Sequence, residues 1–303
     1  MNSPPQQDMR RGFAFGVAAY GLWGVLPIYF KAIAAVAAVD IVAHRILWSL
    51  PFLALLLFAS RGWGQVRQAI RRRRTLLLLL VTAVLVGINW LLYVYAVTSG
   101  HILAGSLGYY LNPLVNVLLG RFILKERLSW LQWTAIGIAA AGILALAGGA
   151  RDQLWISLTL AVTFSTYGLL RKIALVDAIP GLAIETALLA PLAIGWLAWR
   201  IAAGEPSFGA TGTETALLVA AGVVSTTPLL LFTAAARRLP YSTLGMLQFL
   251  APTLQFVCAV WLYGEPFGTA HAIAFGAIWT ALALYLIELI RAARPPQCPQ
   301  PPE

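Results

Sequence analysis

Polar side chains recur at helical spacing inside long apolar runs of the chain. Tyr109, Asn112 and Asn116 are three and four residues apart, so they share one face of a helix. Polar groups are costly in lipid and usually turn toward a bundle interior, and amides both donate and accept hydrogen bonds. This face could line a path for a neutral or zwitterionic ligand, or it could hold neighbouring helices together.

A matching pair of amides occurs in the second half. Gln248 and Gln255 follow Tyr109 and Asn116 by 139 positions and also share a helical face. Each half therefore offers an aromatic or amide group at an equivalent place. We expect these residues, with Asn112, to contribute to a substrate path, and helix-to-helix bonding is the competing interpretation.

A proline and a glutamate repeat at the same offset. Pro113 precedes Glu126 by 13 residues, and Pro252 precedes Glu265 by 13. A proline inside a helix removes a hydrogen bond and kinks it, either as a static bend or as a hinge. We take both repeated prolines as hinge candidates. We expect both glutamates to be structural, at helix ends, bound to basic groups or backbone amides.

A second aromatic and amide group stands in the run "GINWLLYVYAV". Asn89 shares a helical face with Tyr93, and Trp90 also shares one with Tyr93. Together they could cradle an organic substrate, with ordinary packing as the alternative. Trp23 and Tyr167, in the repeated "WG" and "YG" pairs, are added to the expected path.

Three titratable or charged residues lie inside apolar runs. Arg45 could attract an anionic group, or it could extend to the membrane interface. His44, beside it, could titrate near neutrality or serve as a hydrogen-bonded structural residue. Glu185 is the candidate for proton coupling, and the alternative is an ion pair with Arg171 or Lys172.

The elements that carry these residues are predicted to be membrane helices. The chain is 60% hydrophobic and 11% charged, whereas soluble domains are about 25% charged. The runs do not alternate as barrel strands do, so helices are expected. Ten are predicted, at 12–33, 39–59, 75–97, 102–124, 130–148, 154–171, 182–203, 214–236, 243–264 and 269–290.

The basic residues predict the orientation of these helices. A net charge of +10 could indicate nucleic-acid binding, but the charges lie in short gaps between apolar runs. With both termini in the cytoplasm, 17 of the 21 basic residues fall on the inner side, as the positive-inside rule requires. The segment 60–74 is expected to be an arginine-rich loop that orients the chain and contacts anionic lipid. We read the first run as a retained helix rather than a signal peptide.

Five helices in each half invert the second half relative to the first. Inverted repeats allow alternating access to a site between them. The expected organisation is a cytoplasmic segment at 1–11, repeats at 12–148 and 149–290, and a disordered cytoplasmic tail at 291–303. Gly137, Ala141 and Gly142 form a small-residue face that could serve packing within the chain or a homodimer.

Several segments of the chain resemble the drug/metabolite transporter superfamily of EamA type, and the RarD-like permeases in particular. These segments are "AAYGLWGVLPIYFK", "AHRILWS", "SLGYYLNPLVNVLLG", "STLGMLQFLAPT" and "YGE". The resemblance covers about residues 12–290. It implies an inner-membrane permease with an inverted repeat and a central cavity. Relatives often carry drug-sensitivity labels, but no residue here identifies chloramphenicol as a substrate.

The residues favour a secondary transporter over two other classes. The chain has no GxxxxGK[ST] phosphate loop and no HExxH or GxSxG motif, which disfavours an ATP-driven pump and an enzyme. A sensor or scaffold would not need matched halves. Three scattered histidines and two unpaired cysteines predict no metal and no cofactor. The expected partners are a small-molecule substrate, membrane lipids and a coupling ion such as the proton.

Overall fold

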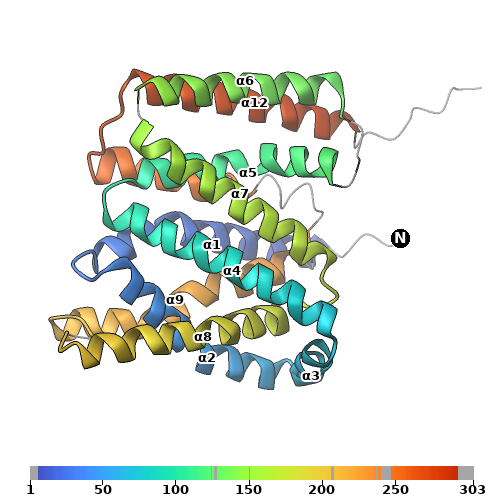
Figure 1. Ribbon diagram of the computed structural model, residues 1–303. Coiled ribbons are helices and arrows are strands. Elements are labelled where there is room, and N and C mark those ends of the chain that lie inside the picture. The colour runs from blue at the N-terminus through green and yellow to red at the C-terminus, as the bar shows by residue number, and fades with distance from the viewer. Residues whose placement is uncertain are drawn as a thin grey trace, which may run out of the picture. The chain divides into compact units, whose positions relative to one another are not determined.

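The computed structural model describes residues 6–123, 125, 128–149, 151–205, 208–236, 238–239 and 247–292. Within these residues every regular element is a helix, as Figure 1 shows. The fold is therefore all-α, as the apolar runs predict.

The helices follow the predicted runs closely. Those of the first half are α1 (Gln6–Lys31), α2 (Ala38–Ala59), α3 (Trp63–Arg71), α4 (Arg73–Thr98), α5 (Ile102–Phe122) and α6 (Trp130–Gly149). Those of the second half are α7 (Arg151–Ile173), α8 (Ala178–Ala202), α9 (Gly212–Ala236), α11 (Leu250–Val257), the π-helix η1 (Cys258–Leu262) and α12 (Thr269–Ala292). Each predicted run overlaps one helix, and the ninth run overlaps α11 together with η1.

Six helices of the described residues are long and apolar enough to cross a membrane, namely α1, α2, α4, α7, α8 and α9. They expose large apolar side chains that water would not favour but lipid accepts. Examples are Leu55, Phe58, Leu80, Leu192 and Ile194. The protein is therefore a multi-pass membrane protein. In α6, α11 with η1, and α12, the described apolar stretches are shorter: Trp130–Leu146, Leu250–Leu262 and Thr269–Leu284.

The expectation of a loop at 60–74 was wrong, because this segment contains α3. Ala69 of α3 is buried against Leu79 of α4 and Ile184 of α8. Trp63 and Ile70 remain exposed. The sequence did not reveal this helix because its arginines interrupt the apolar run by which the other helices were predicted. An amphipathic helix instead carries its charges on one face and its apolar groups on the other.

The chain divides by packing into two compact units. Unit 1 comprises Met1–Asn112 and Trp155–Pro266, and unit 2 comprises Pro113–Leu154 and Phe267–Glu303. The first half of α5 thus belongs to unit 1, and Pro113 opens its second half in unit 2.

Unit 1 is built around α2, which packs against α8 and α9. Leu53 and Leu57 of α2 meet Leu182 and Ala183 of α8 in one apolar cluster. Helix α1 packs against α9 and α11, and α4 packs against α8 and α2. This packing turns one face of each helix inward, so polar residues on those faces are brought together.

Unit 2 contains α6 and α12, which lie side by side (Figure 1). Gly142 of α6 faces Ala274 and Ala277 of α12 so closely that an added β-carbon would lie 2.7 Å from the Ala277 side chain. A β-carbon added to Gly137 would have no atom of the described residues within 4 Å. The small-residue face therefore serves packing within the chain at Gly142 and leaves Gly137 open.

Candidate functional site

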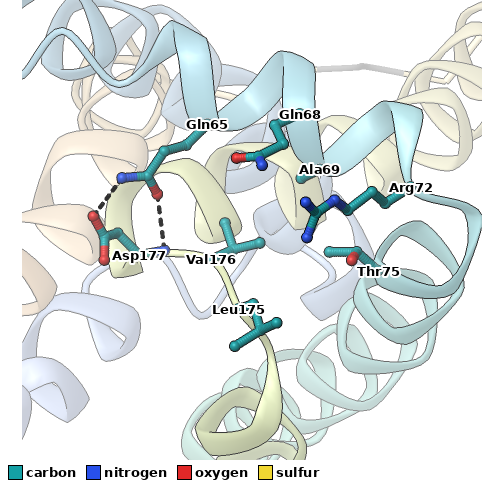
Figure 2. Close-up of a pocket in the computed structure, with 8 residues that line it drawn as sticks. All are labelled: Gln65, Gln68, Ala69, Arg72, Thr75, Leu175, Val176 and Asp177. Carbon is teal, nitrogen blue, oxygen red and sulfur yellow. Dashed lines mark hydrogen bonds between the residues drawn. The ribbon is translucent and has the colours of Figure 1, made fainter.

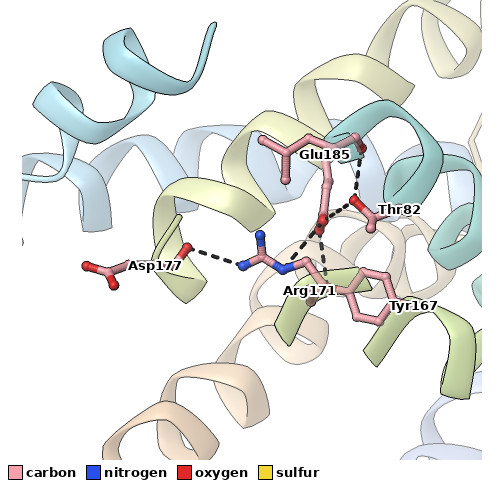
Figure 3. A network of polar contacts seen from close by, with 6 residues as sticks. Thr82, Tyr167, Arg171, Asp177 and Glu185 are labelled. Atoms are coloured by element: carbon pink, nitrogen blue, oxygen red, sulfur yellow. Dashed lines mark hydrogen bonds and ion pairs between the residues drawn. The ribbon is translucent and has the colours of Figure 1, made fainter. Parts of the chain in front are cut away.

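Glu185 of α8 lies at the centre of a buried polar network with Thr82 of α4 and Tyr167 and Arg171 of α7, called here the Glu185 network (Figure 3). Thr82 donates a hydrogen bond of 2.6 Å to Glu185 Oε1, and Tyr167 donates one of 3.2 Å to Oε2. Arg171 Nε lies 3.6 Å from Oε1. The Glu185 side chain is fully buried, so these groups replace its hydration.

Arg171 is held in this place by the start of α8. Its Nη2 atom donates to the carbonyl of Asp177, 3.2 Å away. A β-carbon added to Gly181 would collide with the Arg171 guanidinium, so only glycine leaves room for it there. The ion pair between Glu185 and Arg171, one of the two alternatives from the sequence, is present. A carboxyl in this position can still take part in proton transfer.

A second group surrounds Arg45 of α2, with Tyr29 of α1, Trp90 and Tyr93 of α4, and Tyr109 of α5; we call it the arginine–aromatic cluster. The Arg45 guanidinium carbon lies 4.1 Å from the centroid of the Trp90 ring, which is a cation–π contact. The rings of Tyr93 and Tyr109 are 5.4 Å apart, and both interact electrostatically with Arg45. Arg45 is only 7% exposed, so its side chain does not extend to the surface.

Asn89 joins the cluster to α7. Its Nδ2 atom donates to the Leu160 carbonyl and to Thr163 Oγ1, at 3.1 and 2.9 Å. Its Oδ1 atom accepts a long hydrogen bond of 3.4 Å from Tyr109. Asn89 therefore ties α4 to α7, whereas the sequence had left ordinary packing as the alternative to a role in the path.

A row of aromatic rings connects the arginine–aromatic cluster to the Glu185 network. The Tyr109 ring lies 5.8 Å from the Phe164 ring, which lies 6.2 Å from the Tyr167 ring. Tyr167 then donates to Glu185. Phe164 was not among the predicted path residues, although its spacing of three from Tyr167 on α7 was a usable signal.

Other predicted path residues have different surroundings. Asn112 is buried and its Oδ1 atom has no hydrogen-bond partner among the described residues, whereas Asn116 one turn later is exposed. Gln248 is partly buried just before α11. His44 is buried with its ring 4.6 Å from that of Phe208.

Gln255 and Trp23 meet through a proline effect. Pro27 of α1 has no N–H to donate, which frees the carbonyl one turn earlier, at Trp23. Gln255 Nε2 donates to this carbonyl at 3.2 Å. The Trp23 ring packs against Tyr20 and Phe232. This pair therefore binds α1 to α11 and α9. Gln255 Oε1 is buried and has no hydrogen-bond partner in the part of the chain that the structure describes.

The repeated prolines and glutamates are placed differently. Pro113 lies in the middle of α5, and Pro252 lies in the first turn of α11, where its carbonyl accepts a hydrogen bond of 2.7 Å from Ser106. Glu265 accepts hydrogen bonds from the backbone N–H groups of Ile102 and Leu103, the kind of contact expected from the sequence. Glu126 lies outside the described residues.

A surface pocket of about 270 Å³ lies between α3, the start of α4 and the segment before α8 (Figure 2). Gln65 closes one side of it, donating to Asp177 Oδ2 at 2.6 Å and accepting from the Asp177 N–H at 3.2 Å. Arg72 also lines it. None of its lining residues was predicted to belong to the path, because α3 was not recognised as a helix.

The chain is similar to a family of membrane transporters along nearly its whole length. A family model described as "EamA-like transporter family" matches residues 10–148. An uncharacterized transporter of Pseudomonas aeruginosa is 45% identical over 296 residues, 97% of this chain and 98% of that protein. The protein RarD of Escherichia coli is 42% identical over 299 residues, covering 95% and 98%. One crystal structure shares the fold, with a TM-score of 0.60 at 24% identity over 92% of this chain and 98% of that one.

Proposed function

Since the chain belongs to the EamA-like transporters of the drug/metabolite transporter superfamily, within its RarD-like group, we propose that it is a secondary transporter. In this proposal it moves a small metabolite or drug-like compound across the bacterial inner membrane by alternating access. The observation that supports the proposal is the pair of buried charged residues, Arg45 and Glu185, with a row of aromatic rings between them. Ionisable residues inside a membrane bundle are expensive to keep and typically mark transport pathways.

The proposal includes ten spans arranged as two inverted repeats, 12–148 and 149–290, with both termini cytoplasmic. Helix packing within unit 1 supports it. In this scheme α2 corresponds to α8 and α4 to α9, and the contact of α2 with α9 has its counterpart in that of α8 with α4. Arg45 and Glu185 are each the eighth residue of their helices. Inversion would place one charge toward the outer face and the other toward the inner face.

In the proposed path the substrate passes the arginine–aromatic cluster and then the Tyr109, Phe164 and Tyr167 rings. Asn112 belongs to this proposed path, and its amide oxygen accepts no hydrogen bond from the described residues. Pro113 and Pro252 are the proposed hinges. The Glu185 network is the proposed coupling site, where proton uptake on Glu185 would release Arg171 and allow α7 to move against α8.

Uptake by purified protein in liposomes tests the function. We would screen amino acids, nucleosides, polyamines and amphenicol drugs for thermal stabilisation, then measure uptake of each hit with and without a pH gradient. We expect at least one hit to be transported. In Glu185→Gln uptake should persist but lose its response to the gradient, whereas Glu214→Gln, on the exposed start of α9, should respond as the wild type does. If compounds bind and none is transported, the proposal fails in favour of a sensor.

A further inference from the structure

Arg45 is a buried cation that has no opposite charge beside it in the described part of the chain. It lies in a stretch of α2, residues 41–46, in which every residue is buried. Among the residues that the structure describes, no carboxylate lies within ion-pair distance of it. A charge removed from water without a counter-charge is strongly disfavoured, and a guanidinium does not escape the penalty by losing its proton.

The acidic residues of unit 1 that the structure describes are engaged elsewhere. Each has partners of its own in the described part of the chain. Asp8 pairs with Arg238, Asp40 and Glu205 with Arg200, Asp177 with Gln65, Glu185 with Arg171, Glu214 with Thr211, and Glu265 with the amides of α5. An ion partner for Arg45 must therefore come from outside these residues.

The surroundings of Arg45 suit an organic anion. Trp90 covers one face of the guanidinium and leaves its N–H edge for other partners. The hydroxyl of Tyr93, near this cation, is buried and has no hydrogen-bond partner within the described residues. Trp90 and Tyr109 are only partly buried, so the cluster is not sealed. A cation and an unpartnered hydroxyl stand next to aromatic faces that remain accessible.

We propose that Arg45 and Tyr93 bind the anionic group of the transported compound, and that Trp90 and Tyr109 pack against its aromatic or apolar body. This inference rests on the proposed transport function and assigns its substrate class, an organic carboxylate or phosphate. Guanidinium N–H groups match two oxygens of either group, and the tyrosine hydroxyl donates to one of them. Binding supplies the counter-charge that the described residues do not provide.

The alternative is a purely structural cation–π contact, in which Arg45 only fastens α2 to α4. The binding role and the structural role of Arg45 differ in how protein stability and ligand binding respond to substitution. Removing a structural contact lowers stability. Removing an uncompensated charge or an unpartnered hydroxyl from a binding site leaves stability equal or higher and weakens the ligand.

The test uses full-length protein in detergent and four probes: benzoate, phenyl phosphate, benzyl alcohol and benzylamine. Binding is followed by tryptophan fluorescence and by the shift in melting temperature. We expect the wild type to bind benzoate, phenyl phosphate or both, and to bind the neutral and cationic probes far more weakly. The two anions distinguish a carboxylate from a phosphate site.

The variants isolate the site. Arg45→Gln should weaken binding of the anionic probe about ten- to hundredfold, and Tyr93→Phe about three- to tenfold, while neither lowers the melting temperature of the free protein. Arg67→Gln, an exposed arginine of α3, is the matched control and should bind as the wild type does. Trp90→Phe should remove the fluorescence response.

Three results would overturn the inference: no anionic probe binds, benzyl alcohol binds as tightly as benzoate, or Arg45→Gln binds normally. The fate of the transport proposal is read separately in liposomes. Uptake of a neutral compound that is unaffected by Arg45→Gln would refute the anion site and leave the transporter standing. Anion binding without uptake of any compound would refute the transport proposal and leave the anion site standing.

Discussion

At the scale of single residues, Glu185 shows how burial and partners define a role. Three side chains from α4 and α7 reach its carboxyl group. Arg171 itself depends on space left by Gly181. Breaking a buried ion pair by displacing one partner leaves an uncompensated charge, which costs more than the pair contributes. The network should therefore be sensitive to a single added methyl group.

Gly181→Ala should displace the Arg171 guanidinium and destabilise the protein by about 1–3 kcal/mol, because the flexible arginine can move away but the buried Glu185 carboxylate then loses this partner. Thermal unfolding in detergent measures the change, and uptake in liposomes should fall with it. Gly195→Ala is the matched control on the same helix, since its β-carbon would meet open space. Equal melting temperatures for the two variants would contradict the proposed fit of Arg171.

At the scale of helices, close approach and capping decide the packing. Helix α6 reaches α12 through Gly142, and Glu265 receives the first two N–H groups of α5, which have no partner inside the helix. Both features depend on residues far apart in the chain. Substitutions at these residues should therefore change the stability of each helix contact in a specific way.

Gly142→Ala should separate α6 from α12 and cost about 1–3 kcal/mol, because the new β-carbon would press on Ala277 and on the Ala274 backbone. Gly137→Ala, on the same helix, should be neutral or stabilising by up to about 1 kcal/mol through helix propensity. Unfolding in detergent compares the two. A larger loss at Gly137 would indicate that this position packs against a second copy of the chain.

Burial raises the pKa of Glu265 above its usual 4.5, although the two backbone N–H groups and Lys31 oppose the rise. Because the folded-state pKa exceeds the unfolded one, this group's contribution to stability is greatest below about pH 4.5 and falls as pH rises through the raised pKa. Melting temperatures across this window should decline more steeply in the wild type than in Glu265→Gln. Parallel curves would contradict the burial argument.

At the scale of the whole molecule, the proposed topology places successive loops on opposite faces of the membrane. Ser60, between α2 and α3, should be cytoplasmic, and Ser99, after α4, should be external. Both are exposed. The prediction follows from the count of helices and from the distribution of basic residues.

Single cysteines at these positions test the topology, after Cys258 and Cys298 are replaced by serine. In intact spheroplasts a membrane-impermeant maleimide should label Ser99→Cys at once, and Ser60→Cys only after permeabilisation. Labelling of both positions from outside would refute the proposed orientation. Inside-out membrane vesicles provide the control, because there the same maleimide should label Ser60→Cys at once and Ser99→Cys only after permeabilisation.

Much of the fold follows from local sequence. A segment in lipid must satisfy its backbone hydrogen bonds within itself, so an apolar run of sufficient length becomes a helix whatever its neighbours do. The predicted runs at 39–59 and 75–97 accordingly match α2 and α4 within two residues at each end. The arginine-rich α3 escaped this rule because its helix depends on one buried face, Ala69 against α4 and α8, rather than on length in lipid.

The chain by itself therefore determined the long apolar helices, the family and the list of polar residues that lipid would not tolerate. It did not determine which of them meet. Thr82 and Glu185 are 103 residues apart, and Gln255 finds a carbonyl freed by a proline 228 positions earlier. Such partners depend on helix rotation and crossing, which are set by the packing of many side chains at once. Only the tertiary structure could pair Glu185 with Arg171 and leave Arg45 without an ion partner among the described residues.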